Sequence, residues 1–265
     1  MKGYLPAVFL ALLSPAIARA QTNMPLDTGY SYATFSTYPV PTGTTSSITD
    51  NYWIKIASFE PPSGNPPIAP AWVLPAYAGW QPIGNARWVG PQPTILGGTG
   101  GTSPTAPAYY IYRKCFCLMT GYRNPAISFQ LRADNESNAW LNTTLNVLVP
   151  PSPSSYAGPP ITSQPTTAAM FHAGLNCVYV LVQNTGGPTG FSLAGTVSAT
   201  GLMPAAGAGA NNSFAPCQCG DTGPASSSTS AIKARRTAQN DAQAATLRAI
   251  IAFAEARRRE AAARR

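Results

Sequence analysis

Charged side chains are scarce in this chain, since Asp, Glu, Lys and Arg make up only 10% of its 265 residues. Ordinary globular proteins carry roughly 25%. Residues 21–220 hold six Lys and Arg against five Asp and Glu, whereas residues 233–265 hold nine against three. The net charge of +8 therefore belongs to the tail, and a broad basic surface for nucleic acid is not expected.

Groups that carry out hydrolysis are also few. His172 is the single histidine, and no Gly-x-Ser-x-Gly turn accompanies it, which argues against a Ser-His-Asp enzyme. Glycoside hydrolysis usually needs two carboxylates that flank the bond. Asp134 and Glu136 are neighbours in one turn, where hydrogen bonds to the backbone are the commoner role. We therefore expect a protein without catalytic activity.

The mature chain lacks an apolar run of the roughly 20 residues that cross a membrane. The N-terminus begins instead with a basic residue, continues with an uncharged and mostly apolar stretch, and reaches the small residues of Ala18-Arg19-Ala20. This pattern predicts a signal peptide over residues 1–20. The expected location is extracellular or at the cell surface.

Glycine and proline are abundant, with 23 and 27 residues, and 5 Trp, 12 Tyr and 9 Phe supply apolar material for a core. Ile127, Phe129, Leu131 and Ala133 alternate with polar residues, which indicates a strand with one dry face and one wet face. Further strands are expected over residues 50–56, 71–74, 86–89, 109–118, 175–183 and 190–197. We predict an all-β fold, with an antiparallel β-sandwich over residues 45–200 that follows a polar lead-in at residues 21–44.

The C-terminal part differs in composition. Residues 201–230 are rich in small residues and predict a flexible linker that contains two cysteines. Residues 231–265 consist mainly of helix-forming Ala, Arg, Gln and Glu and predict a basic α-helical tail. An apolar stripe at helical spacing consists of Ile232, Leu247, Ile250, Ile251 and Ala254. The tail is expected either to be a solvated helix or to bind a protein partner or an anionic surface.

Three stretches follow one another in order: Tyr109-Tyr-Ile-Tyr-Arg-Lys-Cys-Phe116, Leu131-Arg-Ala-Asp-Asn-Glu-Ser-Asn-Ala-Trp-Leu-Asn142, and Gly174-Leu-Asn-Cys-Val-Tyr-Val-Leu-Val-Gln-Asn184. Together they resemble the galactose-binding-like jelly-roll modules of secreted proteins and glycosidases. The resemblance covers residues 50–197 and implies an antiparallel jelly-roll sandwich, which binds glycans in many such modules. Thr143 stands where the family usually has the glycine of a Leu-Asn-Gly turn.

The cysteines are candidates for disulfide bonds in a secreted chain. They are Cys115, Cys117, Cys177, Cys217 and Cys219. The resemblance places the strand of Cys177 beside that of the first two and implies a Cys117–Cys177 bridge, with Cys115 joined to one of the last two. Zinc bound by thiolates is the alternative, although the spacing is Cys-x-Cys rather than Cys-x-x-Cys.

Sugar binding by a β-sandwich needs an exposed aromatic face beside amide and carboxylate groups. Trp80 lies in the loop Ala78-Gly-Trp-Gln-Pro82 and is the best candidate among the tryptophans for such a face, although most tryptophans are core residues. The complete candidate ligand set is Trp80, Asp134, Asn135, Trp140 and Asn142. Asp134 and Asn135 could alternatively form turn hydrogen bonds or hold a structural calcium ion. No other cofactor is expected.

Two classes of function stay open at this point. The first is a secreted module that binds a glycan or another cell-surface polymer without catalysis. The second is a structural or assembly protein, in which the sandwich is a building block and the basic helix engages a partner. A contiguous exposed aromatic strip beside Asn or Asp favours the first class, whereas a polar sandwich with an apolar stripe left on the helix favours the second.

Overall fold

The computed structural model describes residues 21–59, 68–94, 107–204 and 229–263. The predicted signal peptide, most of the predicted linker, and both Cys217 and Cys219 lie outside these residues. The strands are β1 (Gln21–Pro25), β2 (Tyr30–Ser31), β3 (Ser36–Thr37), β4 (Thr49–Phe59), β5 (Ala69–Val73), β6 (Val89–Gly90), β7 (Ala108–Asp134), β8 (Glu136–Leu141), β9 (Val147–Ser152), β10 (Ile161–Thr162), β11 (Gly174–Asn184) and β12 (Gly190–Pro204). A short 3-10 helix, η2 (Ala168–Met170), precedes β11, and helix α1 spans Thr229–Ala263.

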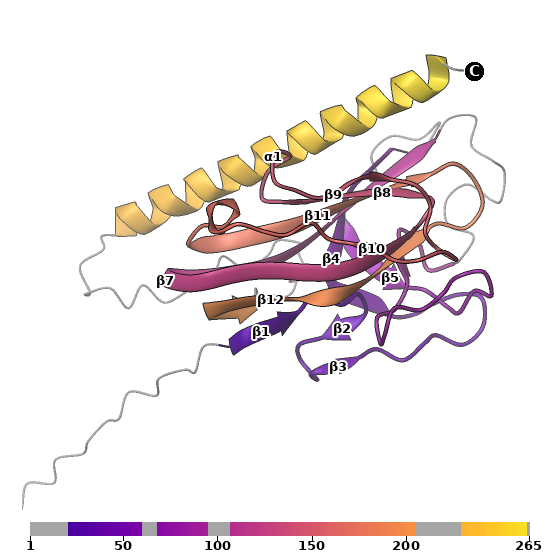
Figure 1. The fold of residues 1–265 in the computed structure, drawn as a ribbon, viewed down its shortest axis with the longest axis horizontal. Coiled ribbons are helices and arrows are strands. Elements are labelled where there is room, and N and C mark those ends of the chain that lie inside the picture. Colours follow the sequence, from indigo (N-terminus) through magenta and orange to yellow (C-terminus); the bar gives the residue numbers. More distant parts are fainter. Residues whose placement is uncertain (1–20, 60–67, 95–106, 205–228, 264–265) are drawn as a thin grey trace, which may run out of the picture.

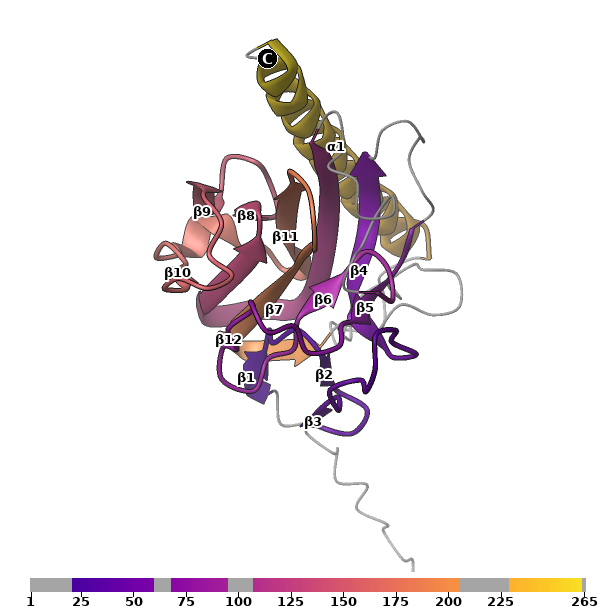
Figure 2. The ribbon, with the colours of Figure 1, turned by 90° about the vertical axis from the view of Figure 1, so that its right-hand side faces the viewer.

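The main sheet has ten strands, and all its pairings are antiparallel. The order is β1-β12-β6-β5-β4-β7-β11-β8-β9, with β10 attached to β7. β12 also pairs with β7, so β12, β6, β5, β4 and β7 close into a ring (Figure 2). The all-β class and the C-terminal helix are confirmed, whereas a jelly roll of two separate sheets is not confirmed, because the closure makes the sheet continuous.

The ring closes because β7 is 27 residues long and changes partners along its length. Residues 109–113 lie between β4 and β11, whereas residues 126–134 pair with β12. Gly121, between these two parts, has a φ of +79°, a conformation that glycine adopts without steric cost. Two separate strands were expected from the sequence, and the structure joins them into one.

The two parts of β7 bury their side chains differently. In the second part, Ile127, Phe129, Leu131 and Ala133 are buried in the core inside the ring, as their alternation predicted. In the first part both faces are dry. Its even-numbered apolar side chains join the interior core, and its odd-numbered ones belong to a second core on the outer face of the sheet.

Helix α1 covers this second core and runs along the outside of the sheet (Figure 1). Ile250 and Ala254 are buried against the sheet, and Leu247 and Ile251 pack beside them. The apolar stripe was therefore predicted correctly at these four positions, but it docks on the sheet of its own chain. The side chain of Ile232 is not among the described groups. Within the described parts of the chain, no helix has the length and apolarity needed to cross a membrane.

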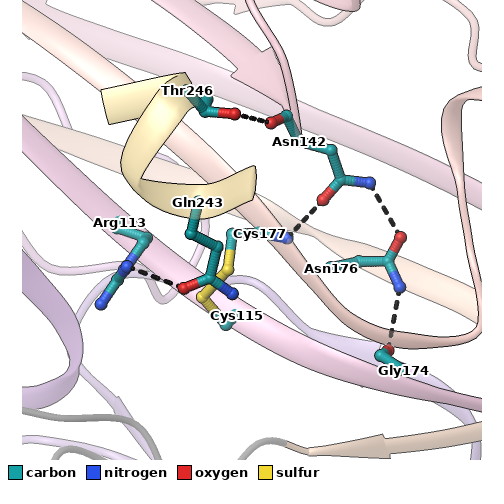
Figure 3. The surroundings of a disulfide bond; sticks show 8 residues. All are labelled: Arg113, Cys115, Asn142, Gly174, Asn176, Cys177, Gln243 and Thr246. Carbon is teal, nitrogen blue, oxygen red and sulfur yellow. Dashed lines mark hydrogen bonds between the residues drawn. A yellow bond between two sulfur atoms is a disulfide. The ribbon is translucent and has the colours of Figure 1, made fainter. Parts of the chain in front are cut away.

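A disulfide bond lies beneath the helix and joins Cys115 on β7 to Cys177 on β11 (Figure 3). The two residues face each other directly in the antiparallel register, with Cα atoms 4.1 Å apart. Cys117 stands opposite Leu175 instead, so the predicted Cys117–Cys177 bridge is wrong. The predicted bond from Cys115 to Cys217 or Cys219 is also wrong, because Cys115 is bonded to Cys177. Cys117 is itself disulfide-bonded.

Candidate ligand-binding site

Three segments meet at one end of the ring. They are the turn between β7 and β8, the loop between β11 and β12, and the segment that joins β5 to β6. Antiparallel pairing brings the first two together, because Glu136 stands opposite Gln183 and Asp134 stands opposite Gly190. The third segment contributes Trp80, which reaches the turn from the side.

Asp134 is the polar centre of this end. Its Oδ2 accepts a 2.9 Å hydrogen bond from the indole nitrogen of Trp80, and its Oδ1 accepts one of 2.8 Å from the amide nitrogen of Asn135. Its backbone carbonyl accepts a 3.0 Å bond from Thr189. The side chain is only 5% exposed, and this burial raises the pKa of the Asp134 carboxyl, while the bond from Trp80 partly offsets the increase.

Asn135 fixes the neighbouring loop to the turn. Its backbone N–H donates to the carbonyl of Gln183 at 3.0 Å. Its Oδ1 accepts from both the backbone nitrogen and the hydroxyl of Thr185, at 2.8 and 3.1 Å. The peptide bond between Asp134 and Asn135 is cis. The hydrogen bonds of Asn135 to Gln183 and Thr185 hold the polar groups of the turn and the loop in fixed positions relative to each other.

Aromatic rings line the side of this polar cluster. The ring of Trp80 stacks on Trp88, with centroids 4.3 Å apart, and meets the edge of Tyr77 at 5.4 Å. Trp80 is only 6% exposed, so its face is not the open surface that its loop position suggested. Tyr77 is 40% exposed and is the aromatic residue of this loop that reaches solvent, as was expected of Trp80. The sequence signal that could have identified Tyr77 is its position in the same loop as Trp80, two residues before Gly79.

The five predicted ligand residues do not form one cluster. Trp80, Asp134 and Asn135 are together, whereas Trp140 and Asn142 are elsewhere. Trp140 is buried in the second core, where its ring meets the edge of Phe253 on α1 at 5.6 Å.

The side chain of Asn142 is engaged in structural hydrogen bonds. Its amide nitrogen donates to Oδ1 of Asn176 at 2.9 Å, and its Oδ1 accepts from the backbone of Cys177 at 2.8 Å (Figure 3). The same nitrogen also donates to the carbonyl of Met170 at 2.9 Å. These bonds hold the end of β8 beside β11. Asn142 therefore has a structural role and is not part of the cluster around Asp134.

Calcium was one predicted use of Asp134 and Asn135. Calcium takes six to eight oxygen ligands, and carboxylates are the most effective of them. In the described part of the chain, no three His, Cys, Asp or Glu side chains lie close enough to hold a metal ion together. The oxygens of Asp134 each accept one N–H group, from Trp80 and Asn135.

A second polar cluster was not anticipated from the sequence. Lys114 is only 1% exposed, and its ammonium group lies 5.1 Å from the ring of Tyr32 and 5.8 Å from that of Trp53. It donates to the backbone carbonyl of Asp27 at 3.2 Å. Burial lowers the pKa of Lys114 to about 8, against an opposing effect of the nearby Asp50 carboxylate. Such a cluster has no local signature, because its members come from distant segments.

Asp50 completes this cluster and fixes the lead-in to the ring. Its carboxylate accepts hydrogen bonds from the backbone nitrogens of Gly29, Tyr52 and Trp53, at 2.6, 2.9 and 3.1 Å. Burial raises the pKa of Asp50, and Lys114 and these N–H groups oppose the increase. The lead-in begins as a strand at the edge of the sheet, since β1 pairs with β12.

No protein-family profile matches the chain. No curated protein matches it either. A solved structure described as "Crystal structure of PA14 domain of MpAFP Antifreeze protein" is similar to part of it, with 16% identity and a TM-score of 0.24. The similarity covers 39% of this chain and 52% of that one, and it is too slight to support a conclusion about the ligand. The strands of this chain confirm a β-rich domain, whereas membership of the galactose-binding-like modules is not confirmed.

Proposed function

We propose that the chain is a secreted, non-catalytic module that binds a glycan at the end of the ring around Asp134. The observation that carries the proposal is the fixed set of hydrogen-bonding groups of Asp134, Asn135 and Thr185 beside an aromatic cluster. Sugars bind to such combinations because hydroxyl groups both donate and accept, while one face of the ring carries C–H groups that pack on aromatic side chains. The resemblance to galactose-binding-like modules adds to this proposal.

The arrangement of the carboxylates supports a role in binding rather than in hydrolysis. Glu136, the nearest acid in sequence to Asp134, forms an ion pair of 2.8 Å with Arg257 on α1. Asp134 is turned toward Trp80 instead. The two carboxylates therefore do not flank a common space, which the hydrolysis of a glycosidic bond requires.

The assembly alternative has less support. It needs an apolar stripe on α1 that is free to bind a partner, yet Leu247, Ile250 and Ala254 pack on the sheet of this chain. Arg259 remains exposed on the helix and could contribute to binding an anionic surface. An attraction of this kind would add to glycan binding and would weaken with salt.

A glycan array probed with the mature full-length chain tests the proposal. The array is probed in calcium-containing buffer and again in EDTA, which separates direct binding from binding through a cation. We expect at least one glycan to be retained, and Asn135→Ala to lower its affinity by about tenfold or more, since Asn135 orients both the turn and Thr185. Asn51→Ala, an exposed amide on β4, is the matched control and should bind as the wild type does. Silence across the array from correctly folded protein overturns the proposal.

A further inference from the structure

Two tyrosines from different segments meet over one glycine beside the candidate site. Tyr77 lies between β5 and β6, and Tyr156 lies between β9 and β10. A Cβ atom placed on Gly79 would lie 3.1 Å from Cε1 of Tyr77 and 3.9 Å from Cε2 of Tyr156. Both rings thus approach the backbone of Gly79, and a side chain at this position would press against the ring of Tyr77.

The backbone around these rings is held in place before any ligand binds. The carbonyl of Tyr156 accepts hydrogen bonds from the backbone of Gln81 at 2.8 Å and from the guanidinium of Arg132 at 3.3 Å. The carbonyl of Tyr77 accepts from the backbone of Trp80 at 3.0 Å. A surface that is already ordered loses little conformational entropy when a ligand settles on it.

The tyrosine surface is joined to the polar cluster through one residue. The edge contact between Tyr77 and Trp80 has a centroid distance of 5.4 Å, and the indole nitrogen of Trp80 is bonded to Asp134. Tyr77 is also the most exposed of the aromatic side chains in this group, at 40%. The aromatic surface and the polar cluster are therefore both in contact with Trp80.

We propose that Tyr77, with Gly79 and Tyr156 beside it, is the surface on which a pyranose ring of the bound glycan stacks. This inference rests on the proposed function and adds the residues that select the ligand. The C–H face of the sugar packs on the ring of Tyr77, and the adjoining hydroxyl groups reach Asn135 and Thr185. The preferred ligand is a saccharide of at least two units, because the platform and the polar cluster are separated by the indole of Trp80.

Affinity measurements on a glycan retained by the wild type test this inference. Tyr77→Ala should lower the affinity by about tenfold, because it removes the aromatic ring on which the sugar packs. Tyr77→Phe keeps the ring and should bind within about twofold of the wild type. Leu145→Ala, an exposed apolar residue in the turn after β8, is the control and should have no effect.

Two further measurements keep the inference falsifiable if Tyr77→Ala disturbs the packing of Trp80. Gly79→Ala places a methyl group next to the ring of Tyr77 and should weaken binding with little change in the melting temperature. Saturating glycan should also protect Tyr77 of the wild type from acetylation by N-acetylimidazole. If Asn135→Ala abolishes binding while Tyr77→Ala and Gly79→Ala bind normally and Tyr77 stays reactive, the inference is wrong and the proposed function stands. If the wild type binds no glycan, both fall.

Discussion

The hydroxyl of Thr246 on α1 donates a 2.6 Å hydrogen bond to the backbone carbonyl of Asn142, 104 residues earlier in the chain (Figure 3). The guanidinium of Arg113 donates to the amide oxygen of Gln243 at 3.2 Å on the same stretch of helix. These bonds flank the apolar contacts of α1 and define its position along the sheet. The part of α1 that contains Gln243 and Thr246 is therefore an integral layer of the fold.

The first prediction concerns the core under α1. Ile250→Ala should lower the free energy of unfolding by about 2–4 kcal/mol, because it leaves a cavity in a fully buried position. Ala249→Ser, on the exposed side of the same helix turn, should cost less than about 1 kcal/mol. Urea denaturation followed by far-UV circular dichroism measures both. Equal effects of the two substitutions would show that the helix is not docked in solution.

The second prediction concerns removal of the helix. A chain that ends at residue 228 should remain β-rich but should be less stable, since the second core then faces water. Trp140 lies in that core, so its fluorescence should shift to longer wavelength. A truncated chain with unchanged stability and an unchanged emission maximum would contradict the packing described above.

The third prediction concerns the disulfide framework. Peptide mapping without reduction should recover a fragment that joins Cys115 to Cys177. Replacing both residues by alanine should lower the free energy of unfolding by up to about 4 kcal/mol, the chain-entropy estimate for a loop of this size. The bridge closes a sequence separation of 62 residues. Recovery of a Cys117–Cys177 fragment instead would show that the strand register is different.

The fourth prediction concerns pH. The pKa of Lys114 is lowered to about 8 from 10.5, so the folded state binds its proton less tightly than the unfolded state does. The stability that this difference contributes is fully present above pH 10.5 and is lost as the pH falls through 8. Between pH 8 and 10 the wild type should gain on the order of 2 kcal/mol relative to Lys114→Met. Parallel profiles of the two proteins in guanidinium denaturation would refute the assignment.

The fifth prediction concerns the carboxyl at the candidate site. Trp80→Phe removes the N–H that favours the ionised form of Asp134, so the pKa of Asp134 should rise further. A group whose pKa is raised in the folded state stabilises that state at pH values below the unfolded pKa. This contribution to stability is lost as the pH rises through the folded pKa. The variant should therefore lose stability toward neutral pH. A carbon-13 NMR titration of the carboxyl measures the shift, and Trp72→Phe, a half-buried indole in the same aromatic cluster, is the matched control.

The sequence was most informative for strands that bury only one of their two faces. The alternation of Ile127, Phe129 and Leu131 with polar residues allows only one orientation of this strand, because a period of two places all apolar side chains on the buried face. The stretch Tyr109–Leu118 is apolar on both faces and needs a cover on each. Its outer cover is supplied by residues 247–254, more than a hundred positions away, and no local pattern links the two.

The candidate site was predicted in part for a similar reason. Asp134 and Asn135 were found because a polar turn between two strands is visible in the sequence. Trp140 and Asn142 were grouped with them because they are close along the chain, yet β8 carries them away at about 3.3 Å per residue, a separation of roughly 20 Å. Trp80 was expected to be an exposed loop residue, but it lies beside the turn and is buried by stacking with Trp88, which comes later in the chain and leaves no local pattern.

The pairing of β1 with β12 determines how the β region would respond to a pulling force. Gln21 stands opposite Leu202 and Pro25 opposite Thr196, so the chain enters and leaves at the same end of this strand pair. Tension between these two points would break the hydrogen bonds between β1 and β12 one after another from this end, rather than all at the same time. A module tethered through both points would therefore release its first strand under a small force. The closed ring behind it would keep its bonds until β12 itself began to peel away from β7.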